Sequence, residues 1–346
     1  MFRLLAAYLA ALVTICVWTD KVEARAIAEI EPVRVVQLDD KEPDDRAPVI
    51  SGVALAPTGK LLATGGDDHI VRIWNAEDGT LVRQLTGHTD WVRGTVFSPD
   101  GRLLASAGND RRIMLWEVSI DRPMRAIASP DKVMQTLVFS PDGSMLAAAG
   151  FEDKVRIYEG NSGELIHELE APGRDIRALV FSPDGNQLAA AGREGRIRLW
   201  NVSTGKPLRD LDAHRRRVSA LAYSPDGKQL ASAGEERNVR FWNTATGEAS
   251  GVLPSRPGRV LALQYCGPKR LAVGGTDNII RIWELGADNE NCRLVGHTGS
   301  ITALAWNPQN GVLISGSFDT TVRMWHLPRG STEKISRTVP APVGED

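Results

Sequence analysis

The feature that most constrains this chain is a segment of about 42 residues that recurs from residue 46 to residue 327. An aromatic residue ends each copy, and successive aromatics are 42, 42, 42, 42, 41 and 42 residues apart. Repetition at this period predicts similar structural units that bury their faces against one another, so we expect one repeat domain where a length of 346 residues would suggest two. The aromatic residues are Trp74, Trp116, Tyr158, Trp200, Trp242, Trp283 and Trp325.

Turn chemistry divides each copy into strands. The sequence SPDG at residues 98–101 places proline second and glycine last, which suits a type I turn between a first and a second strand. Residues 102–107 and 112–116 then form the second and third strands, and Gly79 marks a turn into a fourth strand such as residues 80–85. A four-stranded antiparallel sheet with apolar residues on both faces must be covered on both faces. Seven such sheets packed around one axis form a β-propeller.

The same residues carry a family resemblance. The period, the final aromatic and the Gly-His pairs Gly87-His88 and Gly296-His297 resemble the WD-repeat β-propeller family over residues 46–327. The aspartate that would complete the family's Trp-Asp pair is replaced, for example by Asn75 after the first tryptophan. The fold expected is all-β, a single seven-bladed propeller of four-stranded antiparallel blades.

The resemblance also implies how the ring closes. In the family an amino-terminal strand often completes the last blade, and residues 32–38 resemble the fourth strands of the repeats. This strand should pair beside residues 322–325, so residues 27–45 are assigned as closing strand and linker and residues 46–327 as the propeller. Residues 328–346 lack the apolar pattern and are expected to be a flexible tail.

The amino terminus indicates export. Residues 1–26 resemble a signal peptide, with Arg3, an apolar run at residues 4–18 and the small residues Ala24 and Ala26 at a cleavage site. The run is shorter than the roughly 20 residues of a spanning helix. The predicted location is periplasmic, extracellular or associated with the cell envelope. A retained membrane anchor is the alternative, and contact with a membrane is expected only in that case.

Charge and cysteines narrow the partners further. Without residues 1–26 the chain has 38 basic and 41 acidic residues, a balance that gives no drive toward nucleic acid. Cys266 falls at the end of a first strand and Cys292 in a fourth strand, with two strands between them. That arrangement separates them by roughly 14 Å, so two free thiols are expected.

Two sets of residues look catalytic at first sight. They are His88, Ser106, Asp110 and Trp116, and at the same spacing His297, Ser315, Asp319 and Trp325. The family resemblance implies that they form a buried hydrogen-bond chain in which histidine bridges aspartate and serine and serine reaches the indole nitrogen. Such a chain satisfies polar groups that would otherwise be buried without partners.

The other copies lose part of this set. His214 keeps Ser232 and Trp242 but has Glu236 in place of aspartate, and the remaining copies lack the histidine, so their blades should depend more on packing. Arginines such as Arg72 alternate with apolar residues in the third strands, and we expect their stems to lie between blades with the guanidinium at the rim.

Several observations argue against catalysis. The six histidines are scattered without metal-site spacing, and no phosphate-binding loop or nucleophile elbow is present. The uniform spacing leaves no insertion that could form a lid. No cofactor or metal is expected, and the chain is predicted not to be an enzyme.

The resemblance places partner binding on one face of the disc, at three positions in each repeat. In the first three repeats these are Val49, Ser51 and Asp67; Trp91, Arg93 and Asn109; and Val133, Gln135 and Phe151. In the other four they are Asp175, Arg177 and Arg193; Arg217, Ser219 and Glu235; Arg259, Leu261 and Thr276; and Ser300, Thr302 and Phe318.

Ten of these positions are the predicted partner-binding residues, because aromatic and arginine side chains dominate interface energies. They are Trp91, Arg93, Asn109, Phe151, Asp175, Arg177, Arg193, Arg217, Arg259 and Phe318. Arginines crowd the edge shared by the fourth and fifth repeats, which favours an acidic partner, although a solvated rim explains them equally well.

The resulting hypothesis is an exported, monomeric, non-catalytic propeller that binds a protein or peptide. The alternatives are an enzyme or small-ligand-binding propeller that uses its central channel, and a membrane-anchored sensor subunit.

Overall fold

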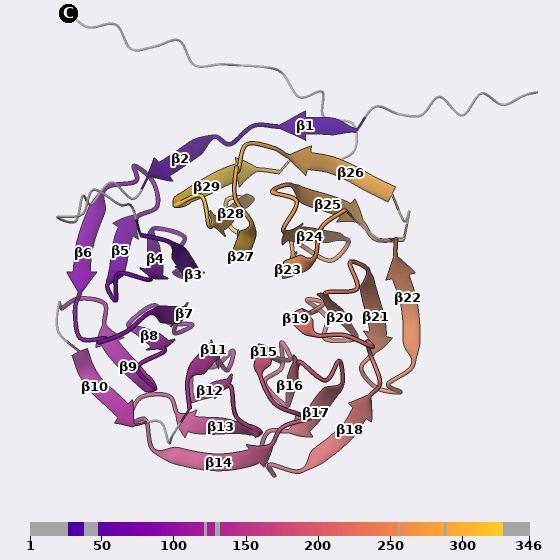
Figure 1. Cartoon of the computed structure of the whole chain (residues 1–346), viewed down its shortest axis with the longest axis horizontal. Coiled ribbons are helices and arrows are strands. Elements are labelled where there is room, and N and C mark those ends of the chain that lie inside the picture. Colours follow the sequence, from indigo (N-terminus) through magenta and orange to yellow (C-terminus); the bar gives the residue numbers. More distant parts are fainter. Residues whose placement is uncertain are drawn as a thin grey trace, which may run out of the picture.

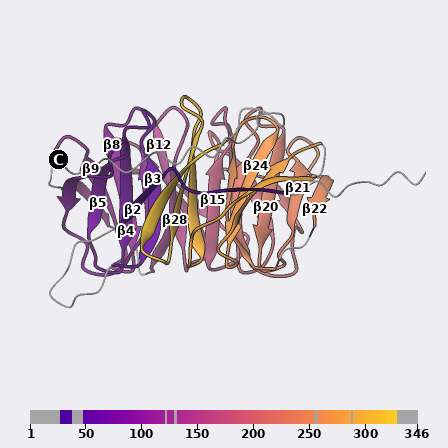
Figure 2. The ribbon, with the colours of Figure 1, turned by 90° about the horizontal axis from the view of Figure 1, so that it is seen from above.

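The computed structural model describes residues 27–37, 48–120, 123–128, 132–254, 257–286 and 289–327. All the regular elements in these residues are strands, and the strands form seven sheets arranged radially around one axis (Figure 1). The predicted all-β, seven-bladed propeller is therefore confirmed. Seen from the side, the ring is a disc whose connecting turns lie on its two opposite faces (Figure 2).

Blades one to four follow the chain, each with its first strand innermost. They comprise β3 (Ile50–Leu55), β4 (Leu61–Gly66), β5 (Val71–Asn75) and β6 (Leu81–Leu85); β7 (Val92–Phe97), β8 (Leu103–Gly108), β9 (Arg112–Glu117) and β10 (Pro123–Ala128); β11 (Met134–Phe139), β12 (Met145–Gly150), β13 (Lys154–Glu159) and β14 (Leu165–Glu170); and β15 (Ile176–Phe181), β16 (Gln187–Gly192), β17 (Ile197–Asn201) and β18 (Pro207–Leu211).

The last three blades include both amino-terminal strands. Blade five has β19 (Val218–Tyr223), β20 (Gln229–Gly234), β21 (Val239–Asn243) and β22 (Ala249–Leu253). Blade six has β23 (Val260–Tyr265), β24 (Arg270–Gly275), β25 (Ile280–Glu284), β26 (Asn289–Leu294) and β1 (Ala28–Ile30). Blade seven has β27 (Ile301–Asn307), β28 (Val312–Ser317), β29 (Thr321–His326) and β2 (Arg34–Gln37).

The amino terminus closes the ring as predicted. Strand β2 pairs antiparallel with β29, with Val36 opposite Val322. Val36 is buried among residues of blades seven and one, so this strand seals the interface between the first and last repeats. The linker residues 38–45 and the tail residues 328–346 lie outside the described residues.

Strand β1 was not predicted. It adds a fifth strand to blade six, parallel to β26, with Glu29 opposite Arg293 and with the Ile30 carbonyl accepting the Val295 N–H at 3.0 Å. Ala28 and Ile30 pack against the cluster between blades six and seven. A segment of three residues is too short to show the alternation that marks a strand. Its parallel pairing with β26 depends on the path of the chain in space.

The hydrophobic core lies between the blades. Among the described residues, seven clusters of buried side chains are found, and each draws its members from two neighbouring blades. Trp116, Trp200 and Trp325, which end third strands, are among the largest fully buried side chains. Each blade therefore depends on both neighbours for stability.

The SPDG turns have the predicted conformation. Gly143 has a φ of +74°, and a Cβ on it would lie 3.3 Å from Cδ of Pro99 in the preceding blade. Ser140 donates its hydroxyl to Asp142 Oδ1 at 2.5 Å, and this bond contributes to lowering the pKa of Asp142. The turns are therefore stabilised by their own side-chain hydrogen bonds, and neighbouring turns contact one another around one face of the disc.

Two further sequence predictions can be compared with the structure. Cys266 and Cys292 are buried free thiols, and burial raises their pKa values to about 12 and about 11. The described residues contain no helix long and apolar enough to span a membrane. The proposed signal peptide, residues 1–26, lies outside them.

Candidate interaction face

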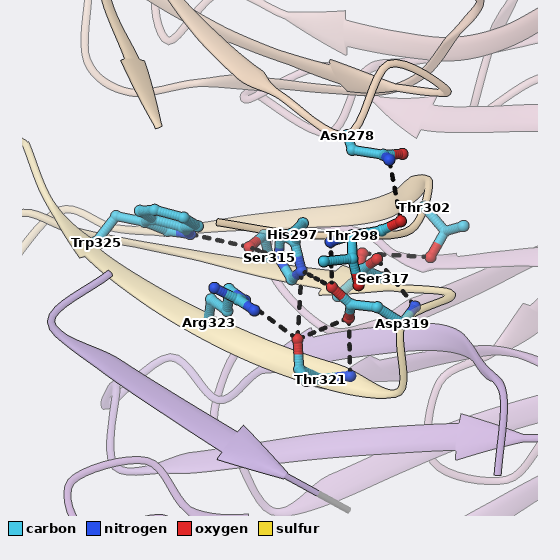
Figure 3. Close-up of polar contacts among 11 residues, drawn as sticks. Asn278, His297, Thr298, Thr302, Ser315, Ser317, Asp319, Thr321, Arg323 and Trp325 are labelled. Carbon is cyan, nitrogen blue, oxygen red and sulfur yellow. Dashed lines mark hydrogen bonds and ion pairs between the residues drawn. The ribbon is translucent and has the colours of Figure 1, made fainter. Parts of the chain in front are cut away.

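The histidine sets form the predicted kind of hydrogen-bond chain. In blade seven, His297 Nδ1 lies 2.8 Å from Asp319 Oδ2, and its Nε2 lies 2.7 Å from Ser315 Oγ (Figure 3). The indole of Trp325 donates to the same serine oxygen at 2.9 Å. In blade two, His88 is 2.8 Å from Asp110 and 2.7 Å from Ser106, and Trp116 is 2.7 Å from Ser106.

The protonation of these chains follows from their donors. An indole N–H can only donate, so Ser315 Oγ accepts it. Because an ionised Asp319 can only accept and takes the Nδ1–H of a neutral His297, Nε2 of that histidine accepts the hydrogen of Ser315. Burial lowers the pKa of His297, and although burial alone would raise the pKa of Asp319, hydrogen bonds from His297, Thr321 and Thr298 hold it well below its usual range.

Burial also argues against a catalytic role for these sets. Ser106 and Ser315 are both 0% exposed, so neither hydroxyl can meet a substrate. A serine nucleophile needs access to a pocket as well as a neighbouring base.

Blade five has a variant of the same chain. His214 Nε2 lies 2.9 Å from Ser232 and its Nδ1 lies 3.1 Å from Glu236, which also receives Arg240 at 3.2 Å. Trp242 donates to Ser232 at 2.9 Å. The longer glutamate thus reaches both a histidine and an arginine.

Three of the four blades without the histidine, blades one, three and six, use arginine in its place. The carboxylate of the turn after the second strand pairs with an arginine four residues later, as Asp68 with Arg72, Glu152 with Arg156 and Asp277 with Arg281. Arg72 is only 2% exposed. The prediction that these guanidinium groups reach the rim was wrong for Arg72, because the largely enclosed carboxylate of Asp68 lies within the arginine's reach. These blades therefore have ion pairs in addition to packing.

A β-bulge places one site residue in every blade. In each first strand, all seven of which are described, the pairing with the second strand skips one residue, as between Val92 and Gly94. A bulged residue leaves the ladder and its side chain is redirected. Each skipped residue is the second residue of its first strand, and the first strands are the innermost strands of the ring (Figure 1). We call the end of the ring where these strands begin the channel mouth. The skipped residues are Ser51, Arg93, Gln135, Arg177, Ser219, Leu261 and Thr302.

The predicted residues of blade two contact one another. The Arg93 guanidinium lies 3.9 Å from the centre of the Trp91 ring, and its Nε donates to Asn109 Oδ1 at 2.8 Å. Trp91 Nε1 donates to Ser51 Oγ of blade one at 3.1 Å. A stacked arginine is thereby held beside a partly exposed indole.

A second group of contacts links blades three, four and five. Arg177 donates to Gln135 Oε1 at 3.0 Å and to Asp175 Oδ1 at 2.5 Å, and its guanidinium lies 5.2 Å from the Phe151 ring centre. Asp175 also receives Arg217 at 2.8 Å. Arg217 lies 3.5 Å from Glu235 as well, so its charge is balanced within the protein.

Three predicted residues stay outside these contacts. Within the described residues, no side-chain hydrogen bond, ion pair or ring contact joins Arg193, Arg259 or Phe318 to the two groups, and Phe318 is 47% exposed. Ser51, Gln135 and Glu235 do join, although they were not among the ten favoured residues. Their position in the repeat could have identified them. They were missed because the selection favoured aromatic and arginine residues.

The other features of the surface lie elsewhere. A cavity of about 440 Å³ lies at the opposite end of the strands, where blade seven meets blade one, and is lined by residues including Arg34, Lys60, Asn307 and Met324. The described residues contain no group of three potential metal ligands.

Comparison with known proteins decides the family. The profile described as "WD domain, G-beta repeat" matches residues 43–75, 79–117, 127–159, 163–201, 205–243 and 289–326, which is more than half of the chain. The chain belongs to the WD40-repeat family. Blade six lies largely outside these matches, yet it folds like the others; its first turn, around Gly267, lacks the SPDG sequence.

Individual WD-repeat relatives match over short segments. B-type cell cycle switch protein ccs52B of Medicago truncatula is 35% identical over 19% of this chain and 14% of its own length. WD repeat and FYVE domain-containing protein 2 of Homo sapiens is 41% identical over 17% of this chain and 15% of its own. Protein transport protein sec13 of Neurospora crassa is 37% identical over 17% and 22%. The matches thus span less than a quarter of each of these relatives.

Proposed function

We propose that this WD-repeat protein is a non-catalytic interaction module that binds a protein or peptide through the face at the mouth of its channel. The observation that carries the proposal is the contact network of blades one to five. It gathers Trp91, Phe151, Arg93 and Arg177 on one face, partly exposed and held in place by neighbours. Aromatic and arginine side chains with fixed positions are the groups that give interfaces most of their affinity.

Further observations support this proposal. The serines of the histidine sets are buried, so they suit bracing, and the uniform repeat adds no lid over the channel. The names of two relatives describe a cell cycle switch protein and a protein transport protein, and both kinds of function suit a protein-binding domain.

The partner can be tested by affinity capture from the native compartment. We expect the wild-type protein to recover a partner that Trp91→Ala and the double variant Arg177→Glu/Arg217→Glu recover at least about tenfold less well. Arg102→Glu is the matched control, because Arg102 is exposed and directly follows an SPDG turn on the opposite face. Equal recovery of every partner by all four proteins would refute the proposed face.

We also propose that the protein works outside the cytoplasm. The proposal rests on the resemblance of residues 1–26 to a signal peptide. Sequencing of the amino terminus of protein purified from its native source should give a first residue near Ile27. Recovery of the intact amino terminus in the membrane fraction would support the anchored alternative.

A further inference from the structure

Three neighbouring bulge residues form a row of hydrogen-bond donors at the channel mouth. Arg93, Gln135 and Arg177 occupy the same repeat position in blades two, three and four, and the first strands of these blades are adjacent. We call these three residues the donor arc. Trp91 stacks on the arginine at one end and Phe151 lies beside the arginine at the other.

The middle of the donor arc holds a donor without an acceptor. Gln135 uses its Oε1 to accept Arg177, which directs its Nε2 away from that arginine. Among the described residues Nε2 is buried and has no hydrogen-bond partner. A buried amide N–H without an acceptor is costly, so this position favours a ligand oxygen.

The charges of the network are not balanced. Asp175 is shared by Arg177 and Arg217, and Glu235 lies beside Arg217. Arg93 instead contacts the neutral Asn109 amide and the Trp91 ring. The contacts therefore include three arginines but only two carboxylates.

The surroundings of Arg93 support the same conclusion. Burial lowers its pKa, and the charge of Arg177 lowers it further. The exposed Asp90 carboxylate, which accepts the Trp91 N–H at 2.7 Å, acts in the opposite direction but more weakly than Arg177. A site where two cations repel each other and one lacks an internal carboxylate attracts an anion.

We propose that the donor arc is a seat for one carboxylate of an acidic peptide, with Arg93 and Gln135 Nε2 as donors and the rings of Trp91 and Phe151 as walls. A carboxylate brings a single negative charge, which matches the one arginine of the network that contacts no carboxylate. A phosphate brings up to two charges, so the Asp175 carboxylate would repel it more strongly than it would repel a ligand carboxylate. This proposal rests on the proposed face and adds the chemistry of its ligand.

The test is fluorescence anisotropy with a labelled peptide of alternating glutamate and glycine, compared with its glutamine and phosphoserine counterparts. We expect the glutamate peptide to bind best to the wild-type protein. Arg93→Gln should weaken binding about tenfold, and Gln135→Met, which keeps the volume but removes the donor, about threefold. Arg216→Gln removes an exposed charge from the same face and should change binding less than about twofold.

Three results would overturn the seat. They are absence of binding by the glutamate peptide, tighter binding of the phosphoserine peptide, and equal weakening by Arg216→Gln and Arg93→Gln, which would indicate general attraction to a basic surface. Thermal unfolding of each variant shows whether it keeps the fold. If Arg93→Gln does not fold, Gln135→Met provides the second measurement.

Capture of the native partner separates this proposal from the proposed function. If Trp91→Ala loses the partner while Arg93→Gln and Gln135→Met retain it, the face is correct and the carboxylate seat is wrong. If all three variants retain the partner, the proposed face itself is wrong.

Discussion

Most blades enclose polar side chains near the turn between their second and third strands, and single residues determine how these are satisfied. Where histidine is present, as in blade seven, it joins the turn carboxylate to a serine and an indole. Where histidine is absent, as in blades one and three, an arginine of the third strand pairs with that carboxylate. A buried carboxylate without either partner would be expensive, so the two arrangements serve the same need.

Removing the serine of a histidine set should destabilise the fold. Ser315→Ala leaves Trp325 Nε1 without an acceptor and His297 Nε2 without a donor, both buried. We expect a loss of about 2–4 kcal/mol in the free energy of unfolding, measured by urea denaturation. Ser203→Ala, which removes an exposed hydroxyl bonded only to Asn201, should cost less than about 0.5 kcal/mol. Equal losses in the two variants would contradict this role of Ser315.

The histidine sets should also make stability depend on pH. His214 and His297 have lowered pKa values because they are buried, so below the ordinary value of 6.5 the unfolded chain takes up protons that the folded chain does not. Stability is therefore complete above 6.5 and declines as pH falls, by at most about 1.4 kcal/mol per pH unit for each histidine. The lowered pKa of Asp319 extends the loss to more acidic pH.

Urea denaturation at a series of pH values from neutral to mildly acidic tests this dependence. His297→Gln should lower stability at neutral pH and flatten the decline. A wild-type protein that became more stable on acidification would rule out neutral, buried histidines in these chains.

At the scale of elements, the amino-terminal strands join blades six and seven to the rest of the ring. Strand β2 supplies the outer strand of blade seven, and β1 extends blade six. The pattern of residues 32–38 resembles a fourth strand and predicted the first pairing. The second pairing depends only on the path of the chain over β26, which no local pattern encodes.

Two adjacent valines of β2 test the closure. Val36 is 4% exposed in the cluster between blades seven and one, whereas Val35 is 45% exposed. Val36→Asp buries a charge at the junction and should cost about 3 kcal/mol or more, while Val35→Asp should be nearly neutral. Thermal unfolding of the two variants provides the comparison. A Tm for Val36→Asp that is no lower than that for Val35→Asp would refute the closing role of β2.

At the scale of the whole molecule, a closed ring fixes the spacing between neighbouring blades. One position of the second strand is always glycine or alanine, and it faces the first strand of the next blade where it is glycine. A Cβ on Gly316 would lie 2.2 Å from Val53 across the junction of blades seven and one. The ring cannot open at this junction without disturbing the other interfaces. The residues at this position are Gly65, Ala107, Ala149, Ala191, Ala233, Gly274 and Gly316.

Substitution at that junction should lower the free energy of unfolding of the whole ring. Gly316→Ala forces apart blades one and seven because the valine at 53 is branched and stiff, and we expect a loss of about 1–3 kcal/mol. Gly251→Ala is the control, since its Cβ would meet Phe241 at an ordinary 3.7 Å. Differential scanning calorimetry measures both. A higher Tm for Gly316→Ala than for the wild type would show that the interface can accommodate the added methyl group, contrary to this prediction.

Some of the candidate face could be predicted and some could not. The repeat position identified Trp91, Arg93 and Asn109, which do contact one another, because equivalent residues of a repeat occupy equivalent places. It did not distinguish Arg217, whose charge is balanced by Asp175 and Glu235, from Arg93, whose charge is not. That difference arises between blades, where residues about 42 positions apart meet.

The sequence by itself determined the number of blades, the strand order within them and the SPDG turns, because each depends on a local pattern repeated in phase. The closing strand followed from the likeness of residues 32–38 to a fourth strand together with the family resemblance. Only the tertiary structure decided the position of β1, the pairing of third-strand arginines with turn carboxylates, and the bulges that bring Arg93, Gln135 and Arg177 to the channel mouth. These features depend on distances and burial between segments that the sequence separates. The physical reason is that a charge or a hydrogen-bond donor acquires its role from neighbours supplied by the next blade.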